Sequence, residues 1–429
     1  MRVFIGSWLA IAFLGGIFLL FDYFQSDKLI TNVSDGPDTR YEKSLAERIG
    51  EAEERSQNVK GLYMTATVAN DQGPAATELR NNVLRLLTTT ELDGLVIDVK
   101  ETEGGLVVDD QLRGLLAELH QKGIWVIARQ VVFKDSSQEK DHPSWYLMRR
   151  DGRLWRDNRG GSWLDPSSPE VWAYQLSAAK AASEAGFDEI QFDYIRFPSD
   201  GDVRNIVYPA YDGKQPKYEV LRKFFDFLHQ NLKAYRPELI LSADLFGHVA
   251  LESEDLGIGQ RLHDIGENFD YVSLMVYPSH YYGGFDVPAD PDRNLPALYY
   301  PYRSPNISEV AVHHPYEVVY RTLLIAEDIL AGRIATATGE IAGLPRPKSG
   351  LGEIGKTSTS SILTIPSSRR AKLRPWLQDF DLAVDSTRGI RYDSAKVRAQ
   401  IDAAETAGSS GWLLWNAANV YTKEALKPE

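Results

Sequence analysis

The stretch DEIQFDYIRFPSDG, residues 188–201, combines a strand pattern with an acidic residue near the strand's end. Ile190 and Phe192 alternate with polar neighbours, as expected for a strand whose two faces meet different surroundings. Asp193 lies on the polar face, and Pro198 interrupts the pattern soon afterwards. This stretch therefore predicts a strand that carries a carboxylate at its C-terminal end, just before the chain opens into a loop.

The composition narrows the functions that are open to the chain. It has 429 residues, of which 43% are hydrophobic and 25% are charged, which is ordinary for a globular protein. There is no cysteine, so disulfides, thiolate metal sites and a cysteine nucleophile are excluded. The formal net charge of -13 argues against a nucleic-acid partner, for which a basic patch would be expected.

An uncharged apolar run occupies residues 3–21 and is about long enough to cross the hydrocarbon core of a membrane as a helix. The run is long for a signal peptide, and no clear small-residue cleavage site follows it. We therefore expect an uncleaved single-pass membrane anchor over residues 1–22; cleavage would instead give a secreted protein. Arg2 favours an orientation with the rest of the chain outside the cytoplasm. Residues 23–58 are polar and are expected to form a stalk.

From residue 59 to residue 429, short strand-like runs alternate with helical runs, which is typical of a (β/α)8 TIM-type barrel of the α/β class. A doubly wound sheet is the alternative, but no strand leads into a glycine-rich phosphate-binding turn. The expected strands cover residues 61–69, 94–100, 124–132, 188–195, 239–246, 271–277, 373–380 and 411–416. The expected helices cover residues 77–90, 111–123, 169–186, 220–235, 315–332 and 394–408. Residues 332–370 are rich in Gly, Ser, Thr and Pro and are expected to be a mobile insertion.

Alternation along the strands predicts which side chains point into the barrel. The inward set is polar and is concentrated at the C-terminal strand ends, the face at which barrel active sites lie. Burying many ionisable groups for stability alone is expensive, so a functional cleft is favoured over an internal hydrogen-bond network. The ionisable members are Asp98, Lys100, Arg129, Asp193 and Asp244. The same rule points Tyr63, Thr65, Gln191, Tyr277, Gln378 and Asn416 inward.

Paired carboxylates across a cleft are the usual apparatus for cleaving glycosidic bonds. Asp193 and Asp244 end neighbouring strands, and Glu101 follows another strand end, so these three are the catalytic candidates. Sugars also require flat apolar platforms and polar rims. The substrate-binding candidates are Tyr63, Asp98, Lys100, Arg129, Trp163, Gln191, Arg196, Tyr277, His280, Gln378, Asp379, Trp415 and Asn416. No cofactor is expected, and no metal site, because no His/Asp cluster has ligand spacing.

The chain resembles the putative glycosyl hydrolase barrel family long catalogued as a domain of unknown function, and it is distantly similar to barrels of the α-amylase group. The matching motifs run from residue 61 to about residue 421 and include LDGLVIDVKETEG, GFDEIQFDYIRFPSDG, LSADLFG, VSLMVYPSHY and GWLLWNA. This resemblance implies a (β/α)8 barrel and hydrolysis of O-glycosyl bonds.

The resemblance also carries over to individual residues. The nucleophilic Asp of α-amylase-like barrels ends the fourth strand, which is the place of Asp193. Their acid is a Glu at the end of the fifth strand, where this chain has the shorter Asp244. That departure leaves Glu101 and Asp379 open as partners of Asp193.

Two functions therefore remain open. The first is a glycoside hydrolase that acts on a polysaccharide outside the cytoplasm, with Asp193 as nucleophile or base. The second is a non-catalytic carbohydrate-binding barrel that scaffolds cell-envelope polymers, which the missing fifth-strand Glu favours. A metal-assisted deacetylase is a third and weaker possibility, because no ligand cluster supports it.

Overall fold

The structure is a computed structural model that describes residues 43–252, 255–281, 283–301, 310–333 and 370–429. Residues from Leu45 to Glu429 belong to one unit. Among the described residues, no helix is both long enough and apolar enough to span a membrane. The anchor expected over residues 1–22, the stalk up to residue 42 and nearly all of the expected insertion lie outside the described residues.

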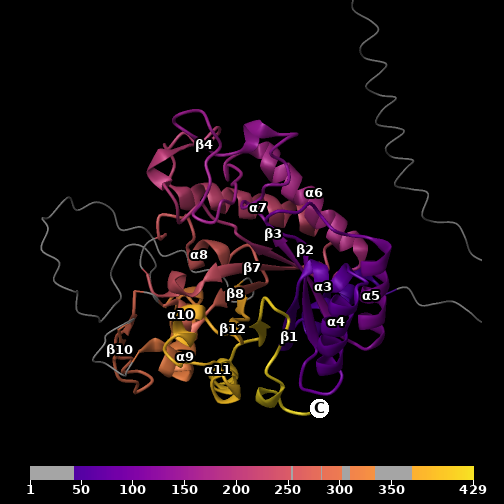
Figure 1. Cartoon of the computed structure of the whole chain (residues 1–429), viewed down its shortest axis with the longest axis vertical. Helices are drawn as coiled ribbons and strands as arrows, with labels where there is room; N and C mark the ends of the chain where they lie inside the picture. The colour runs from indigo at the N-terminus through magenta and orange to yellow at the C-terminus, as the bar shows by residue number, and fades with distance from the viewer. Residues whose placement is uncertain (1–42, 253–254, 282, 302–309, 334–369) are drawn as a thin grey trace, which may run out of the picture. The chain divides into compact units, whose positions relative to one another are not determined.

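Eight parallel strand positions close into a barrel, because the last strand pairs with the first and every strand pairs with its neighbours on both sides (Figure 1). The order around the barrel is β1 (Val59–Met64), β2 (Gly94–Lys100), β3 (Trp125–Val131), β5 (Glu189–Asp193), β7 (Ile240–Phe246), β8 (Tyr271–Met275), β12 (Trp376–Gln378) and β13 (Gly411–Trp415). The short β11 (Lys372–Leu373) precedes β12 and also pairs with β8. The predicted (β/α)8 barrel is therefore confirmed.

Helices follow the strands and surround them (Figure 1). The longer helices are α4 (Pro74–Leu87), α5 (Asp110–Gln121), α6 (Pro169–Ala185), α7 (Lys217–Tyr235), α9 (Pro315–Leu330) and α11 (Ser394–Thr406). Short helices are α3 (Ala66–Asn70), α8 (Leu262–Ile265), α10 (Ala383–Ser386), η1 (Pro143–Trp145), η2 (Val203–Asn205), η3 (Gly247–Ala250), η4 (Pro278–His280), η5 (Ala311–His313) and η7 (Lys423–Ala425). Another helix, α2 (Leu45–Arg55), precedes β1 in a region that we expected to be stalk.

Two antiparallel pairs of short strands lie outside the barrel, in its long loops. β4 (Met148–Arg149) pairs antiparallel with β6 (Ile206–Val207), and β9 (Phe285–Val287) pairs antiparallel with β10 (Leu298–Tyr300). Isolated bridges, including Lys134 with Trp163, fold the long excursion after β3 back on itself. These pairings make that excursion an ordered part of the C-terminal loops.

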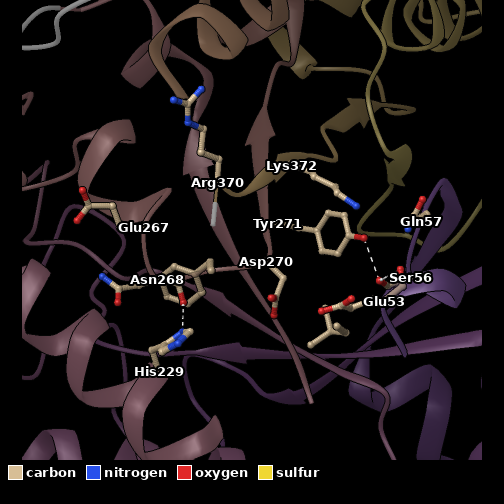
Figure 2. A pocket seen from close by; sticks show the side chains of 12 residues that line it. Glu53, Ser56, Gln57, His229, Glu267, Asn268, Asp270, Tyr271, Arg370 and Lys372 are labelled. Carbon is tan, nitrogen blue, oxygen red and sulfur yellow. Dashed lines mark hydrogen bonds between the residues drawn. The ribbon is translucent and has the colours of Figure 1, made fainter. Parts of the chain in front are cut away.

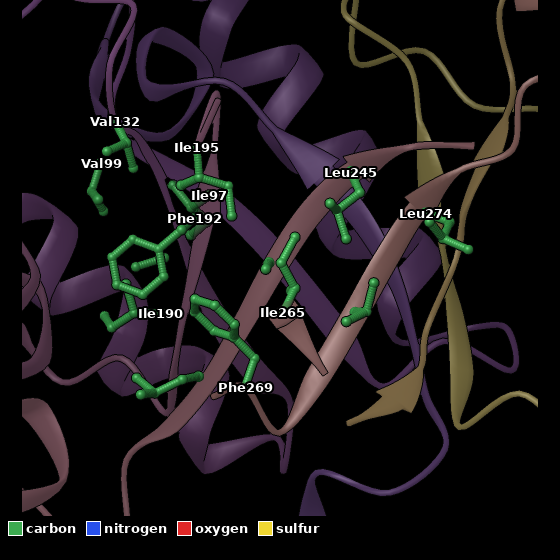
Figure 3. Packing of buried hydrophobic residues seen from close by; sticks show 14 of the residues in the cluster. Ile97, Val99, Val132, Ile190, Phe192, Ile195, Leu245, Ile265, Phe269 and Leu274 are labelled. Atoms are coloured by element: carbon green, nitrogen blue, oxygen red, sulfur yellow. The ribbon is translucent and has the colours of Figure 1, made fainter. Parts of the chain in front are cut away.

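The strand alternation predicted from the sequence divides the core into two layers. Ile190 and Phe192 of β5 face outward and pack with Phe269 and Ile265 between the barrel and its helices (Figure 3). The inner layer is smaller, and most of its buried side chains are apolar or aromatic. It contains Val59, Tyr63, Val96, Trp125, Ile127, Ile240, Tyr271, Tyr277, Trp376 and Leu413. The inward charged residues gather at the C-terminal end, while Gln191 and Ser273 form a hydrogen bond in the middle and one buried ion pair lies at the base.

That basal ion pair joins Glu189 of β5 to Arg374, which lies between β11 and β12. Arg374 Nη1 lies 2.8 Å from Glu189 Oε2, and both side chains are fully buried. Trp125 Nε1 also donates to Glu189 Oε2 at 2.9 Å, and Arg374 Nη2 donates to the backbone carbonyl of Ser56 at 2.7 Å. Because each charge is neutralised and hydrogen-bonded, the base of the barrel is closed without an unpaired buried charge.

Two glycines are needed where the chain turns tightly or approaches itself closely. Gly186 ends α6 with φ of 114°, a left-handed conformation that favours glycine at a helix C-terminus. Gly411 begins β13 with φ of 86°, and a Cβ atom there would lie 2.0 Å from the backbone oxygen of Val59. Gly411 therefore permits β13 to pair with β1 and close the barrel.

Candidate active site

Arg129 lies at the centre of the polar residues at the C-terminal end of the barrel. Its Nη1 lies 2.6 Å from Asp98 Oδ1, and its Nη2 lies 2.5 Å from Asp193 Oδ2. Its Nε lies 3.8 Å from Asp244 Oδ2. Burial acts to lower the pKa of Arg129, but the carboxylates of Asp98 and Asp193 outweigh this effect and raise it. One guanidinium thus holds together acids from β2, β5 and β7.

Asp193 is the last residue of β5, and both of its oxygens accept hydrogen bonds. Oδ2 accepts from Arg129, and Oδ1 accepts from the backbone N–H of Tyr194 at 2.6 Å. Tyr194 has a φ of 53°, which turns the chain sharply as the strand ends. The Asp193 residue remains 7% exposed. These contacts suit an ionised carboxylate whose remaining surface faces solvent at the mouth of the barrel.

Asp244 is enclosed more completely, with only 1% of its surface exposed. Its Oδ1 accepts a hydrogen bond of 2.8 Å from Trp376 Nε1. Burial raises the pKa of Asp244 well above its ordinary value, and the neighbouring charge of Asp193 raises it further. Ionisation of this carboxyl is therefore disfavoured beside Asp193, and little of its surface is available to a substrate.

Glu101 follows β2 and differs from both aspartates, because it is only partly buried. Burial and then the negative charge of Asp98, to which it hydrogen-bonds, raise the pKa of Glu101 from 4.5 to about 7. A carboxyl with that pKa holds its proton over part of the neutral range and can lose it readily. Glu101 therefore has the protonation behaviour of a general acid.

Aromatic rings form one wall beside these carboxyls. Tyr63 and Trp415 stack with their ring centroids 3.9 Å apart, and Trp376 meets Trp415 edge-on at 5.4 Å. The guanidinium of Arg129 lies 5.0 Å from the Trp415 ring centroid. The Tyr63 hydroxyl donates to Asp98 Oδ2. Trp415 is partly exposed, so its ring offers a flat apolar surface near the acidic residues.

Lys100 departs from the inward orientation that strand alternation predicts. The pairing of β2 with β3 shifts register between Asp98 and Lys100, so a bulge changes the direction of the lysine side chain. Lys100 is fully buried, and its Nζ pairs with Asp135 Oδ2 at 2.6 Å and lies over the Tyr174 ring of α6. Lys100 is therefore outside the funnel, and the expectation that it lies beside Asp98 was wrong.

Several other predicted binding residues form hydrogen bonds within the barrel and its loops. Asp379 accepts hydrogen bonds from the backbone and hydroxyl of Thr422, at 2.9 Å and 2.6 Å. Gln191 donates to Ser273 Oγ at 3.0 Å inside the barrel. Gln378 donates to Ser279 Oγ and to the Phe380 carbonyl, while Asn416 donates to the carbonyls of Asp379 and Val420. Their predicted contacts with substrate remain predictions.

Trp163, Tyr277 and His280 lie in loops or strand ends on the same face. Trp163 is almost fully buried and donates from Nε1 to Asp157 Oδ2 at 3.0 Å. Tyr277 is also buried, and its ring centroid lies 5.2 Å from that of His280. Burial lowers the pKa of His280 to about 4, so its imidazole is neutral near pH 7. These three residues shape the loops around the site.

Trp376 and Thr65 are residues whose roles our sequence analysis did not anticipate. Trp376 donates to Asp244, and alternation from Gln378 could have placed its indole inside the barrel. Thr65, expected to continue an inward-facing strand, instead caps α3, because its hydroxyl accepts from the Val68 N–H at 3.2 Å. Threonine at a helix N-terminus is a recognisable capping signal.

A cavity lies at the opposite end of the strands, at their N-terminal ends (Figure 2). It has a volume of about 520 Å³ and is lined by residues that include Ser56, His229, Asp270, Tyr271 and Lys372. None of the predicted catalytic residues lines it. Because barrel enzymes carry their active sites at the C-terminal strand ends, the acidic cluster around Arg129 is the better candidate.

The part of the chain that the structure describes contains no candidate metal site. Within those residues, no group of three or more His, Cys, Asp or Glu side chains is arranged to hold a metal ion.

Comparison with known proteins identifies related sequences and folds. The family described as "Putative glycosyl hydrolase domain" matches residues 61–338 and 336–421. No curated protein matches the chain. The PgaB (BpsB) glycoside hydrolase domain from Bordetella bronchiseptica is 12% identical, with a TM-score of 0.52, and the match covers 85% of this chain and 94% of that domain. That likeness supports the barrel fold.

Two further solved structures are similar over different shares of the chain. A hypothetical protein from Ruminiclostridium thermocellum ATCC 27405 is 29% identical over 46% of this chain and 98% of its own, with a TM-score of 0.37. The α-galactosidase TtGalA from Thermus thermophilus is 12% identical over 84% of this chain and 58% of its own, with a TM-score of 0.45.

Proposed function

Because the chain belongs to the putative glycosyl hydrolase domain family, we propose that it hydrolyses glycosidic bonds of a polysaccharide outside the cytoplasm. Asp193 acts as nucleophile or base, and Glu101 acts as the general acid. The extracytoplasmic site of action rests on the apolar run over residues 3–21 and on Arg2 before it.

The different environments of the two carboxyls carry this proposal. Asp193 receives hydrogen bonds from Arg129 and from a backbone N–H, which favour an ionised acceptor. Glu101 lies near Asp98, and its pKa is raised to about 7, so it can carry a proton at neutral pH. Carboxyls held in opposite protonation states are what glycosidic cleavage requires.

The proposed reaction divides between these two side chains. Glu101 donates its proton to the leaving glycosidic oxygen as the bond from that oxygen to the anomeric carbon breaks. Asp193 either attacks the anomeric carbon or takes a proton from the attacking water. Arg129 holds Asp193 in place, and the Trp415 ring offers a stacking surface for a sugar. Water supplies the hydroxyl of the new reducing end, and the net reaction consumes no cofactor.

A polysaccharide panel tests the proposal directly. The full chain is incubated with each polymer, and new reducing ends are measured for the wild type and for Asp193→Asn. We expect Asp193→Asn to lose about 10²–10⁴-fold or more in rate while its thermal unfolding and polymer binding are retained. Asp286→Asn makes the same chemical change at an exposed position of β9 and is expected to leave the rate unchanged.

Two outcomes would contradict parts of the proposal. Full activity in Asp193→Asn would refute the assigned role of Asp193. Binding of a polymer by the wild type with no cleavage of any panel member would instead favour a carbohydrate-binding barrel, the second function considered from the sequence.

A further inference from the structure

Arg196 lies in the loop after β5, three residues beyond Asp193, and its guanidinium is surrounded by aromatic rings. The guanidinium carbon lies 4.9 Å from the ring centroid of Trp163, 5.2 Å from that of Tyr194 and 4.7 Å from that of Phe246. Only 7% of the residue is exposed. Because Phe246 ends β7, this aromatic box lies between the C-terminal ends of β5 and β7, next to the candidate catalytic residues.

The positive charge of Arg196 is not neutralised by an ion pair with any described residue. Asp193 and Asp157, whose charges act on it from a distance, are each paired with another cation. Asp200 is exposed and accepts a hydrogen bond from the backbone N–H of Asn158 instead. Burial lowers the pKa of Arg196, which reflects the cost of keeping this charge away from water. A buried cation of this kind favours a complementary anion.

The hydrogen bonds of Arg196 leave one edge of the guanidinium available. Both bonds come from Nη1, which donates to the Phe197 carbonyl and to Ser199 Oγ, each at 3.1 Å. Nε and Nη2 donate to no described residue, and neither is a solvent-excluded atom. The Nε–Nη2 edge of an arginine presents two parallel N–H groups, which fit the two oxygens of a carboxylate or phosphate.

We infer that the polysaccharide carries an anionic group, a uronic acid carboxylate or a phosphate substituent, which the free Nε–Nη2 edge of Arg196 binds beside Asp193. This inference rests on the proposed function and names its substrate class. The aromatic box holds the guanidinium in place, so little side-chain entropy is lost when the anion binds. Arg196 therefore selects acidic sugars over neutral ones at the same site.

The main competing role for Arg196 is structural. Its bonds to Phe197 and Ser199 and its packing against Trp163 would also clamp the loop after β5. A loop clamp would affect charged and neutral sugars alike. An anion site would affect only the charged ones, so the ratio between the two separates these roles.

The experiment measures binding to the full-length Asp193→Asn protein, which leaves the sugars uncleaved. The probes are oligogalacturonates and oligoglucuronates, each paired with its carboxyl-reduced counterpart, and Kd is obtained by titration calorimetry. About 0.15 M salt screens the protein's net negative charge beyond roughly 8 Å. We expect at least one uronate to bind about tenfold or more tightly than its reduced counterpart. Competition by inorganic phosphate or by free glucuronate then distinguishes the two kinds of anion.

Three variants in the same background assign the preference to Arg196. Arg196→Gln is expected to bring the charged and reduced probes to equal affinity, while Arg196→Lys keeps part of the preference if the glutamine variant unfolds. Arg204→Gln, which removes an exposed arginine eight residues along, is expected to keep the full preference. Equal weakening of both probes by Arg196→Gln, or no preference for either anion in the Arg196 protein, would overturn the inference.

Wild-type reducing-end assays on the same probes separate this inference from the proposed function. Cleavage of neutral polymers with no charge preference would reject only the anion site. A charge preference that depends on Arg196, without cleavage of any polymer, would reject only the hydrolase.

Discussion

Replacing Asp98 with asparagine is expected to lower the pKa of Glu101 and so to change the pH range in which the site works. Burial keeps part of the elevation, but the substitution removes the negative charge of Asp98. Neighbouring charges of this kind shift a pKa by about one unit or more, so the variant's Glu101 should titrate at about pH 6 or below but above 4.5. At pH 7 the protonated fraction of Glu101 should then fall about fivefold or more.

Carbon NMR of side-chain-labelled glutamate measures this titration without a substrate. The Glu101 resonance is assigned by its loss in Glu101→Gln, and its midpoint is compared between the wild type and Asp98→Asn. Asp286→Asn, which removes an exposed and distant carboxylate, should leave the midpoint at about 7. A wild-type midpoint near 4.5, or an unchanged midpoint in Asp98→Asn, would refute the reasoning.

The same proton also affects stability. Between about pH 4.5 and pH 7, folded Glu101 keeps a proton that the unfolded chain has already lost. The contribution of Glu101 to the free energy of unfolding therefore decreases as pH rises through that window. Glu101→Gln should remove this contribution, so from pH 5 to pH 7 its urea midpoint should fall less, or rise more, than that of the wild type. A larger fall in the variant than in the wild type would contradict the assignment.

Two further predictions concern the buried side chains of Asp244 and Arg374. Asp244→Asn should retain activity within about tenfold of the wild type, because this side chain is buried and accepts a hydrogen bond from Trp376, so little of it can reach a substrate, whereas Glu101→Gln should lose about 10²–10⁴-fold in reducing-end assays. Arg374→Met should cost about 3–5 kcal/mol in urea unfolding, because Glu189 is left as an unpaired buried charge. Adding Glu189→Gln to Arg374→Met should recover part of that loss, and no recovery would mean that lost packing dominates.

Much of the barrel could be predicted because its strands have a strict period of two. The run 94–100 was predicted as a strand and is observed as β2, and the outward positions of Ile190 and Phe192 follow from the same alternation. The first strand was predicted over residues 61–69 but ends at Met64, because Thr65 caps a short helix. Local capping overrode the β-rich composition there.

Alternation also predicted that Asp98, Arg129 and Asp193 share one face, which the observed ion pairs bear out. It failed at Lys100, because alternation assumes unbroken register and the bulge after Asp98 is not visible in the residue pattern. The raised pKa of Glu101 could not be predicted either, since it depends on burial and on distances that only the folded chain defines.

In the proposed mechanism, burial favours Glu101 over Asp244 as the general acid. Asp244 occupies the fifth-strand position, but its side chain is short, and one of its oxygens accepts a hydrogen bond from Trp376 Nε1. A leaving oxygen could reach it only by displacing that contact or Arg129. Glu101 comes after the end of β2, has a longer side chain and stays partly exposed. Because burial disfavours a negative charge on Asp244, the proposed mechanism has Arg129 pair mainly with Asp98 and Asp193.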